Sequence, residues 1–279
     1  MREKIKWFVE AYKLYRGVRT PESYADFVGI AGLMPRIAQS AGAYPQGPDG
    51  GWRYDFMRRP VHDKLLKKYD LDVIAGQGAA FERALRVMDW LCAHTYYNGM
   101  SLWTAALPDN GLSVLRYVYD KPFKRAINCW HKALVLADCL IAVGIVAMPI
   151  GMISQNNCHY TVHVWLPEEQ RWAMLDPSFN AYITGETGRA LNLIEIHECH
   201  RNNKEMHVAQ YHLNGTQDCR ETYLSSFILG SLQELLVCND AGNKRSGLQN
   251  CLVPEGVTIR DNKLRAITAT ELLAEPKLI

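Results

Sequence analysis

The spacing of apolar residues changes abruptly near the middle of the chain, and this change limits the folds that are open to it. From Cys129 to Val143 the sequence has the pattern of an apolar helix. Beyond that helix the period falls to two, as in strands, over residues 145–153, 159–166 and 171–176. The sequence therefore predicts an α+β fold in which an apolar helix leads into a group of strands.

Composition narrows the class of protein further. The chain has 279 residues, 48% of them hydrophobic, which is enough for one large core with extensions. Its 31 basic and 29 acidic residues nearly balance and form no basic face, so we expect no nucleic-acid partner. No apolar run reaches the roughly 20 residues of a membrane span, and the charged start does not resemble a secretory signal. We therefore interpret the eight cysteines as reduced thiols of a cytoplasmic protein that has no membrane contact.

Helical patterns also precede Cys129, whereas the sequence after residue 195 is mixed. We expect a helical N-terminal region over 1–75, a core over 76–195 and a C-terminal segment over 196–279 that completes the domain. Residues 41–60, rich in glycine and proline, are predicted to form a long irregular loop. Further helices are predicted at 1–16, from Thr20, at 61–69, 81–93 and 112–119, and further strands near 223–237 and 251–259.

Cys129 occupies the first position of the apolar helix. The thiolate is the reactive form of cysteine, and a helix N-terminus stabilises it through the helix dipole and unpaired N–H groups. The same N–H groups can bind an oxyanion formed during acyl transfer. Position alone also fits a second interpretation, a buried structural cysteine. The choice between the two depends on whether a base lies nearby.

Two histidines on the first strand of a predicted hairpin could supply that base. His159 and His163 lie on one face of this strand, and the segment Pro167–Gln170 has the character of a turn. The second strand ends at Asp176, which is followed by a proline. A carboxylate there could orient whichever histidine it meets.

The length of the turn decides which histidine faces the carboxylate. If Trp165 pairs with Gln170 across a four-residue loop, then His159 lies opposite Asp176. Placing His163 opposite Asp176 would need a two-residue loop without glycine or asparagine, which is unfavourable. The sequence therefore predicts a His159–Asp176 pair and leaves His163 as an ordinary sheet residue.

Together these segments resemble the transglutaminase-like superfamily. The stretch from Cys129 to Ala147 is similar to that family's cysteine helix, which ends in a turn like Gly144-Ile-Val-Ala147. Residues 159–167 are similar to the strand that begins with the catalytic histidine. Residues 171–178 resemble the Trp-x-x-x-Asp-Pro ending of the next strand. The likeness covers about residues 85–180.

The resemblance implies a papain-like fold, with the cysteine-bearing helix packed against an antiparallel sheet. It also implies roles: Cys129 as nucleophile, His159 as general base and acid, and Asp176 as the orienting carboxylate. The expected reaction is hydrolysis of a peptide, protein or small amide substrate through a thioester. Asn128 and Val146 stand where the family often has glycine and proline. Candidates for a second oxyanion donor are Tyr96, Tyr97 and Trp103.

Two other functions are compatible with these residues. The acyl acceptor could be an amine, as in a cross-linking or biosynthetic acyltransferase, and a water-excluding channel would favour this. The chain could also be a non-catalytic interaction module on the same fold, although such a module need not keep all three groups. The sequence does not specify the oligomeric state.

A histidine-rich segment after the predicted core raises the question of a metal. Its potential zinc ligands are His197, Cys199, His200, His207, His212 and Cys219. Their spacing matches no compact zinc site. We therefore expect neither a metal nor another cofactor, and we interpret the segment as a polar surface region.

Overall fold

The computed structural model describes most of the chain from Gly42 onward. The described residues are 42–48, 50–97, 99, 110–119, 126–154, 157–212, 220–238, 250–255 and 263–276. The helices predicted at 1–16 and from Thr20 lie outside this part. The helices are α3 (Pro60–Tyr69), α4 (Leu71–Ala75), α5 (Ala80–His94), α6 (Gly111–Tyr119), α7 (Cys129–Ala142), α8 (Leu193–Arg201), α9 (Arg220–Thr222), a π-helix (Tyr223–Leu229) and α10 (Ala269–Leu272).

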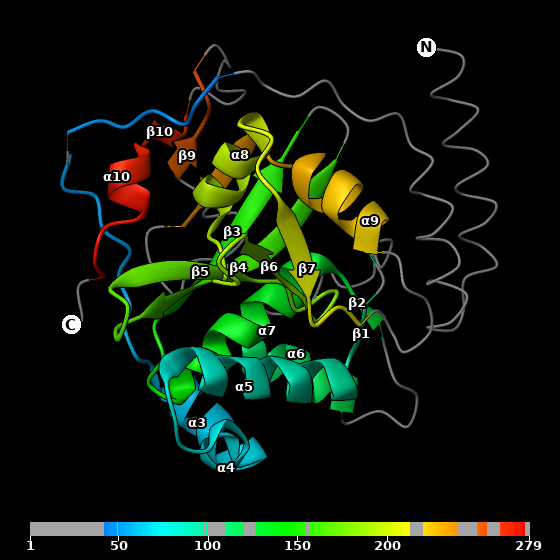
Figure 1. Cartoon of the computed structure of the whole chain (residues 1–279). Helices are drawn as coiled ribbons and strands as arrows, with labels where there is room; N and C mark the ends of the chain where they lie inside the picture. The colour runs from blue at the N-terminus through cyan, green and yellow to red at the C-terminus, as the bar shows by residue number, and fades with distance from the viewer. Residues whose placement is uncertain are drawn as a thin grey trace, which may run out of the picture.

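A central sheet organises the described chain (Figure 1). Its six strands follow the order β10-β9-β8-β3-β4-β5, and every pair is antiparallel except β9 with β10. The strands are β3 (Ala147–Ile153), β4 (Cys158–Leu166), β5 (Arg171–Leu175), β8 (Glu234–Val237), β9 (Asn250–Leu252) and β10 (Arg265–Ala266). Two short pairs lie outside it: β1 (Tyr96–Tyr97) with β2 (Ala126–Ile127), and β6 (Tyr182–Gly185) with β7 (Met206–Ala209). The prediction of an α+β fold is confirmed, and β3, β4 and β5 agree with the sequence to within two residues.

Local sequence accounts for both ends of α7. The side chain of Asn128 accepts the N–H of His131 at 3.1 Å and so caps the first turn. At the other end Gly144 has φ +79°, a conformation that favours glycine. The N–H of Ile145 then bonds to the carbonyl of Leu140 at 2.9 Å, in the Schellman arrangement that ends many helices. The helix is thereby fixed to the residues that the sequence predicted.

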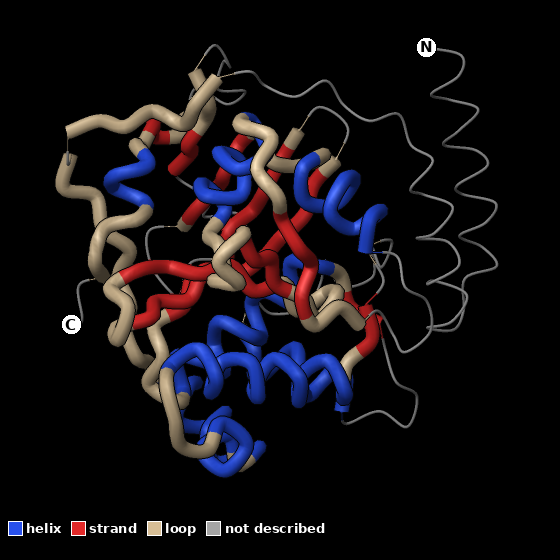
Figure 2. Tube along the Cα trace, in the orientation of Figure 1, coloured by secondary structure: helices blue, strands red, loops and turns tan. Residues whose placement is uncertain are grey.

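Alternate residues of β4 face two different layers. Tyr160, Val162 and Val164 belong to the apolar cluster that contains α7 and the other helices of one layer, α3 to α6. Trp165 belongs to a second cluster, which includes α8, the π-helix and the buried aromatic residues of the irregular segment before α3. Figures 1 and 2 show α3–α7 gathered on one side of the sheet and α8 on the other. The sheet is therefore the middle layer of three.

A carboxylate inside α7 ties neighbouring helices to it. Asp138 is buried, accepts the N–H of Gly111 at 2.6 Å, and lies 3.4 Å from the imidazole of His62. These contacts connect α7 to the first residue of α6 and to α3. A Cβ on Gly111 would lie 3.0 Å from the Cβ of Asp138, so a larger residue would force the two elements slightly apart. A polar group in this apolar helix is thus explained by the contacts that it makes.

The sequence after residue 193 differs from the prediction in three places. Residues 223–229 form a π-helix instead of a strand, and only Glu234–Val237 of the predicted strand is extended. Helix α8 was not predicted, although Asn192 and Glu195 form a capping box at its start. In the last predicted strand, over 251–259, β9 ends at Leu252 and residues 253–255 are not in a strand, while 256–259 lie outside the described residues. Short apolar runs fit a buried helix as well as a strand, so periodicity alone could not decide here.

The irregular segment before α3 is as predicted in its described part. Residues 42–48 and 50–59 contain no helix or regular strand. Their aromatic side chains nevertheless enter the core, and Trp52 donates its backbone N–H to Glu271 at 3.2 Å. No helix among the described residues is both long enough and apolar enough to span a membrane. The division of the chain at residues 75 and 195 stays a prediction.

Candidate active site

Cys129 is the first residue of α7 and is partly exposed. It packs against both apolar clusters, the one on the α7 side of the sheet and the one on the α8 side. The first N–H groups of a helix have no partner inside the helix. Asn128 accepts one of them, that of His131. The thiol is therefore held at the positive end of a well-formed helix.

His159 and Asp176 form a short, buried contact beside this thiol. The Nε2–H of His159 donates to Oδ2 of Asp176 at 2.6 Å, and both side chains are 0% exposed. The second oxygen of Asp176 accepts the N–H of Ser178 at 2.8 Å. Cys129 interacts with the same imidazole electrostatically. The structure thus brings the three predicted residues together, while Nδ1 of His159 has no hydrogen bond of ordinary geometry within the described chain.

The hairpin that makes this contact has a different register from the predicted one. The turn occupies residues 167–170, and Trp165 pairs with Trp172 instead of Gln170. The predicted register is therefore wrong by two residues. A shift of two keeps the same side chains on the same face. His159 and Asp176 consequently meet as diagonal neighbours, which are close enough for long side chains to touch.

The surroundings of His159 favour its charged form. Burial alone would lower the pKa of this imidazole, but the charge and hydrogen bond of Asp176, together with Cys129, outweigh it. They raise the pKa of His159 from 6.5 to about 10. At neutral pH the ring is therefore an imidazolium held between a carboxylate and a thiol. A neighbouring cation of this kind favours the thiolate form of a cysteine.

Aromatic rings from distant parts of the chain enclose the imidazole. The ring centroids of Phe179 and Phe227 lie 5.7 Å from that of His159, and the ring of Tyr97 lies 6.4 Å away. Tyr223 is fully buried, and the negative charge of Asp176 adds to burial in raising the pKa of its phenol. Sequence reasoning named only Tyr97, as an oxyanion candidate, because no local pattern connects these residues. Trp103 lies outside the described residues.

His163 contacts α8 and Trp172 instead of the thiol. It is buried, its Nε2 accepts the N–H of Leu193 at 3.1 Å, and its ring stacks on Trp172 at 6.2 Å. Burial lowers the pKa of His163 to about 3, so the ring is neutral. Leu193 is the first residue of α8, so this histidine holds the start of that helix. The interpretation of His163 as an ordinary sheet residue agrees with these contacts.

The histidine-rich segment is divided between several elements. His197 and His200 lie in α8, His207 lies in β7, and His212 follows that strand. Cys219 lies outside the described residues. Among the residues that are described, no three His, Cys, Asp or Glu side chains are placed to hold a metal ion.

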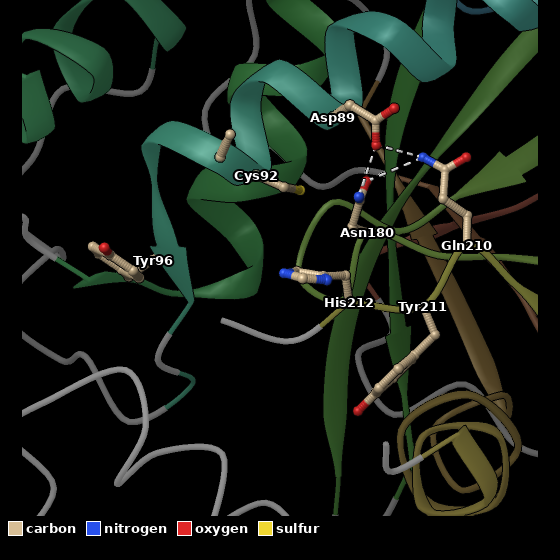
Figure 3. A pocket seen from close by; sticks show the side chains of 8 residues that line it. Asp89, Cys92, Tyr96, Asn180, Gln210, Tyr211 and His212 are labelled. Carbon is tan, nitrogen blue, oxygen red and sulfur yellow. Dashed lines mark hydrogen bonds between the residues drawn. The ribbon is translucent and has the colours of Figure 1, made fainter. Parts of the chain in front are cut away.

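A pocket of about 460 Å³ is lined in part by His212 of this segment (Figure 3). Its lining comes from α5, β1 and the segments that follow β5 and β7: Asp89, Cys92, Ala93, Tyr96, Asn180, Gln210, Tyr211 and His212. Asp89 accepts hydrogen bonds from Asn180 at 2.8 Å and from Gln210 at 2.6 Å. Sequence reasoning predicted neither the pocket nor Asp89, because Asp89 and Gln210, which meet there, are 121 positions apart.

Comparison with known proteins gives only weak similarities. No family model and no curated protein matches the chain. One similar solved structure is a candidate cysteine protease from Cytophaga hutchinsonii, with 15% identity, 42% of this chain and 37% of that chain covered, and a TM-score of 0.31. Another is a candidate protease from Parabacteroides distasonis, with 14% identity, coverage of 47% and 29%, and a TM-score of 0.28. Both matches span less than half of either chain, and at these TM-scores they assign neither a family nor an activity.

Proposed function

We propose that this protein is a thiol acyl-transfer enzyme that hydrolyses a peptide or amide bond, with Cys129, His159 and Asp176 as its triad. The observation that carries the proposal is the buried 2.6 Å contact of His159 with Asp176 beside a thiol at a helix N-terminus. A buried charged pair is costly to keep, and replacement by apolar residues is often neutral or stabilising. A catalytic role gives this chain a reason to retain it.

The geometry supports a sequence of proton and acyl transfers. The Cys129 thiolate attacks the substrate carbonyl, and the resulting oxyanion faces the free N–H groups of the first turn of α7. His159, charged at neutral pH, gives its proton to the departing amine, which leaves a thioester on Cys129. The neutral His159 then removes a proton from water, which attacks the thioester and releases the acid. Asp176 keeps the ring oriented and stabilises its charged form throughout.

Thiol reactivity tests the nucleophile. Cys158 is exposed, adjacent to His159 in sequence, and located on the same strand, so it is a matched control for Cys129. We expect limiting iodoacetamide at pH 6.5 to label Cys129 at least about tenfold faster than Cys158, as found by peptide mapping. Intact-mass analysis after incubation with activated esters should show one acyl adduct, which is absent in Cys129→Ser. Preferential labelling of Cys158, with Cys129 spared, contradicts the assignment.

A second candidate function is transfer of the acyl group to an amine. The aromatic side chains of Phe179, Phe227 and Tyr97 around His159 favour it, since apolar walls keep water from the thioester. Partition of the acyl-enzyme between water and added primary amines distinguishes the two. Turnover that depends strictly on one class of amine would replace hydrolysis with transfer and keep the same triad.

A further inference from the structure

The pocket beside α5 carries a carboxylate that no basic side chain of the described residues neutralises. Asn180 and Gln210 both donate to Oδ1 of Asp89. These amides orient the carboxylate but leave its charge in place, and within the described chain no hydrogen bond reaches Oδ2. Figure 3 shows the three side chains joined at one wall of the pocket. The second oxygen is therefore available to a ligand.

Other parts of the lining add to the negative character of the pocket. Cys92 and Ala93 lie in the last turn of α5, where the helix dipole places a partial negative charge. Tyr96 and Tyr211 contribute aromatic rings, whose faces attract cations. A carboxylate, a helix C-terminus and aromatic rings together suit a positively charged group.

One buried cation opposes this preference. The ammonium group of Lys132 lies 3.9 Å from the sulfur of Cys92 and donates to the carbonyl of Thr95 at 3.0 Å. Lys132 is 2% exposed, so a ligand cannot reach it directly. Asp89 is exposed and can be contacted directly. Because attraction between charges falls with distance, direct contact with Asp89 outweighs the more distant repulsion.

The pocket is connected to the proposed triad in three ways. Tyr96 pairs with Ala126, on the strand that leads into Cys129. The thiol of Cys92 donates to the carbonyl of Pro177 at 3.0 Å, one residue after Asp176. A third connection runs through ring contacts: Tyr211 stacks on Phe179 at 6.0 Å, and Phe179 contacts His159. A group bound in the pocket is thus connected to the imidazole through Tyr211 and then Phe179.

We propose that this pocket binds a positively charged alkylamine or guanidinium group. Resting on the proposed function, the group is the basic side chain of a substrate whose reacting carbonyl lies at Cys129. The charge preference itself depends only on Asp89 and its neighbours. It can therefore be tested whether or not Cys129 is a nucleophile.

Cys92 provides a reporter inside the pocket. Two methanethiosulfonate reagents of similar size, one 2-aminoethyl and one 2-sulfonatoethyl, are applied separately, and the rate at each cysteine is followed by peptide mapping. We expect the ratio of cationic to anionic rates at Cys92 to exceed that at exposed Cys158 by about tenfold. Asp89→Asn should remove the excess and keep the amide contacts, whereas Glu82→Gln, at the exposed start of α5, should not. An excess of the anionic reagent at Cys92 overturns the proposal, because Lys132 would then dominate.

Direct binding covers the case in which Cys92 reacts with neither reagent. N-acetyl-lysine methylamide is titrated against the Cys129→Ala protein by NMR, beside its norleucine and glutamate counterparts and n-butylamine. The lysine compound should bind at least about tenfold more tightly than the norleucine compound, and Asp89→Asn should abolish the difference. Equal affinity for lysine and norleucine compounds refutes the pocket assignment.

The two sources of a cationic group give different results in the same titration. Affinity for n-butylamine equal to that for the lysine compound indicates a free amine, whereas weaker binding of n-butylamine indicates a side chain held within a peptide. A charge preference at Cys92 together with an unreactive Cys129 would keep the pocket and reject the proposed function. A reactive Cys129 without a charge preference would do the reverse.

Discussion

Strand β4 carries two equally buried histidines, one at its start and one in its middle, of which one is charged and the other neutral. His159 and His163 are both 0% exposed and lie on one face of the strand. Asp176 and Cys129 raise the pKa of His159 to about 10, whereas His163 has only a backbone N–H and an aromatic ring, and its pKa falls to about 3. Burial alone therefore does not decide the charge of a histidine. The partners that the fold places beside it do.

The largest expected effect is the loss of activity when the charged histidine is removed. His159→Ala should lower turnover of an activated ester by about 10²–10⁴-fold, the usual contribution of a general acid–base group. His163→Ala should retain most of the activity of its folded fraction, because its ring contacts α8 and Trp172 instead of the thiol. Steady-state kinetics and circular dichroism on both variants measure this contrast. An inactive His163→Ala protein together with a nearly normal His159→Ala protein would exchange the roles assigned to the two histidines.

The next effect concerns Asp176, the carboxylate that makes the pKa values of the two histidines differ. Asp176→Asn removes the charge that holds the His159 proton, so the pKa of His159 should fall from about 10 toward or below 6.5. Turnover should fall less than in His159→Ala, since an amide can still accept or donate a hydrogen bond. NMR titration of isotopically labelled histidine follows each ring. An unchanged titration of His159 would mean that Asp176 is not its dominant partner.

Linkage gives the two histidines opposite effects on stability. The raised pKa of His159 contributes stability that is complete below pH 6.5 and lost as the pH rises through about 10. The lowered pKa of His163 means that its protonation opposes folding, so stability is lost as the pH falls from 6.5 toward 3. Urea unfolding at pH 5 and 7 should show wild type losing more stability on acidification than His163→Phe. Equal losses would show that His163 is not neutral in the folded state.

The smallest effect is expected for Tyr223, which lies near Asp176 and is not part of the proposed triad. Tyr223 is buried near Asp176, and burial together with the charge of this carboxylate raises the pKa of its phenol. Tyr223→Phe removes one neutral polar group near the carboxylate, and such a group is worth at most about 1 kcal/mol, which corresponds to roughly a fivefold change in turnover. The KM should be unchanged, because the phenol faces Asp176 and not the pocket. A loss as large as that of Asp176→Asn would give Tyr223 a more direct part in the reaction.

Local sequence predicted α7 and the strands β3 to β5, and together with the family resemblance it singled out Cys129, His159 and Asp176. Each depends on patterns within about 50 residues: apolar residues at helical spacing, a glycine at 144, and alternation along one hairpin. The register could be wrong by two and the contact of His159 with Asp176 survive, because side chains repeat with a period of two.

The rest of the site depends on contacts that no local pattern encodes. Phe227 reaches His159 from a π-helix whose sequence also fits a strand. Asp89 meets Gln210 across 121 residues. Such pairs are set by how the layers pack, and a single sequence gives no signal for them. The α8 capping box at Asn192 was a local signal that sequence reasoning passed over.

The order of strands in the sheet also has a consequence during synthesis. Strand β3 is apolar along its length, and its outer edge is paired by β8 only at Gly151–Ile153. The other half carries Pro149, which has no N–H to offer to a foreign strand. Strand β8 begins at Glu234, so the ribosome adds it several seconds after β3 at about 5–20 residues per second. In that interval Gly151–Ile153 is an open edge that can pair with other nascent chains, and chaperone dependence in cells would follow from this delay.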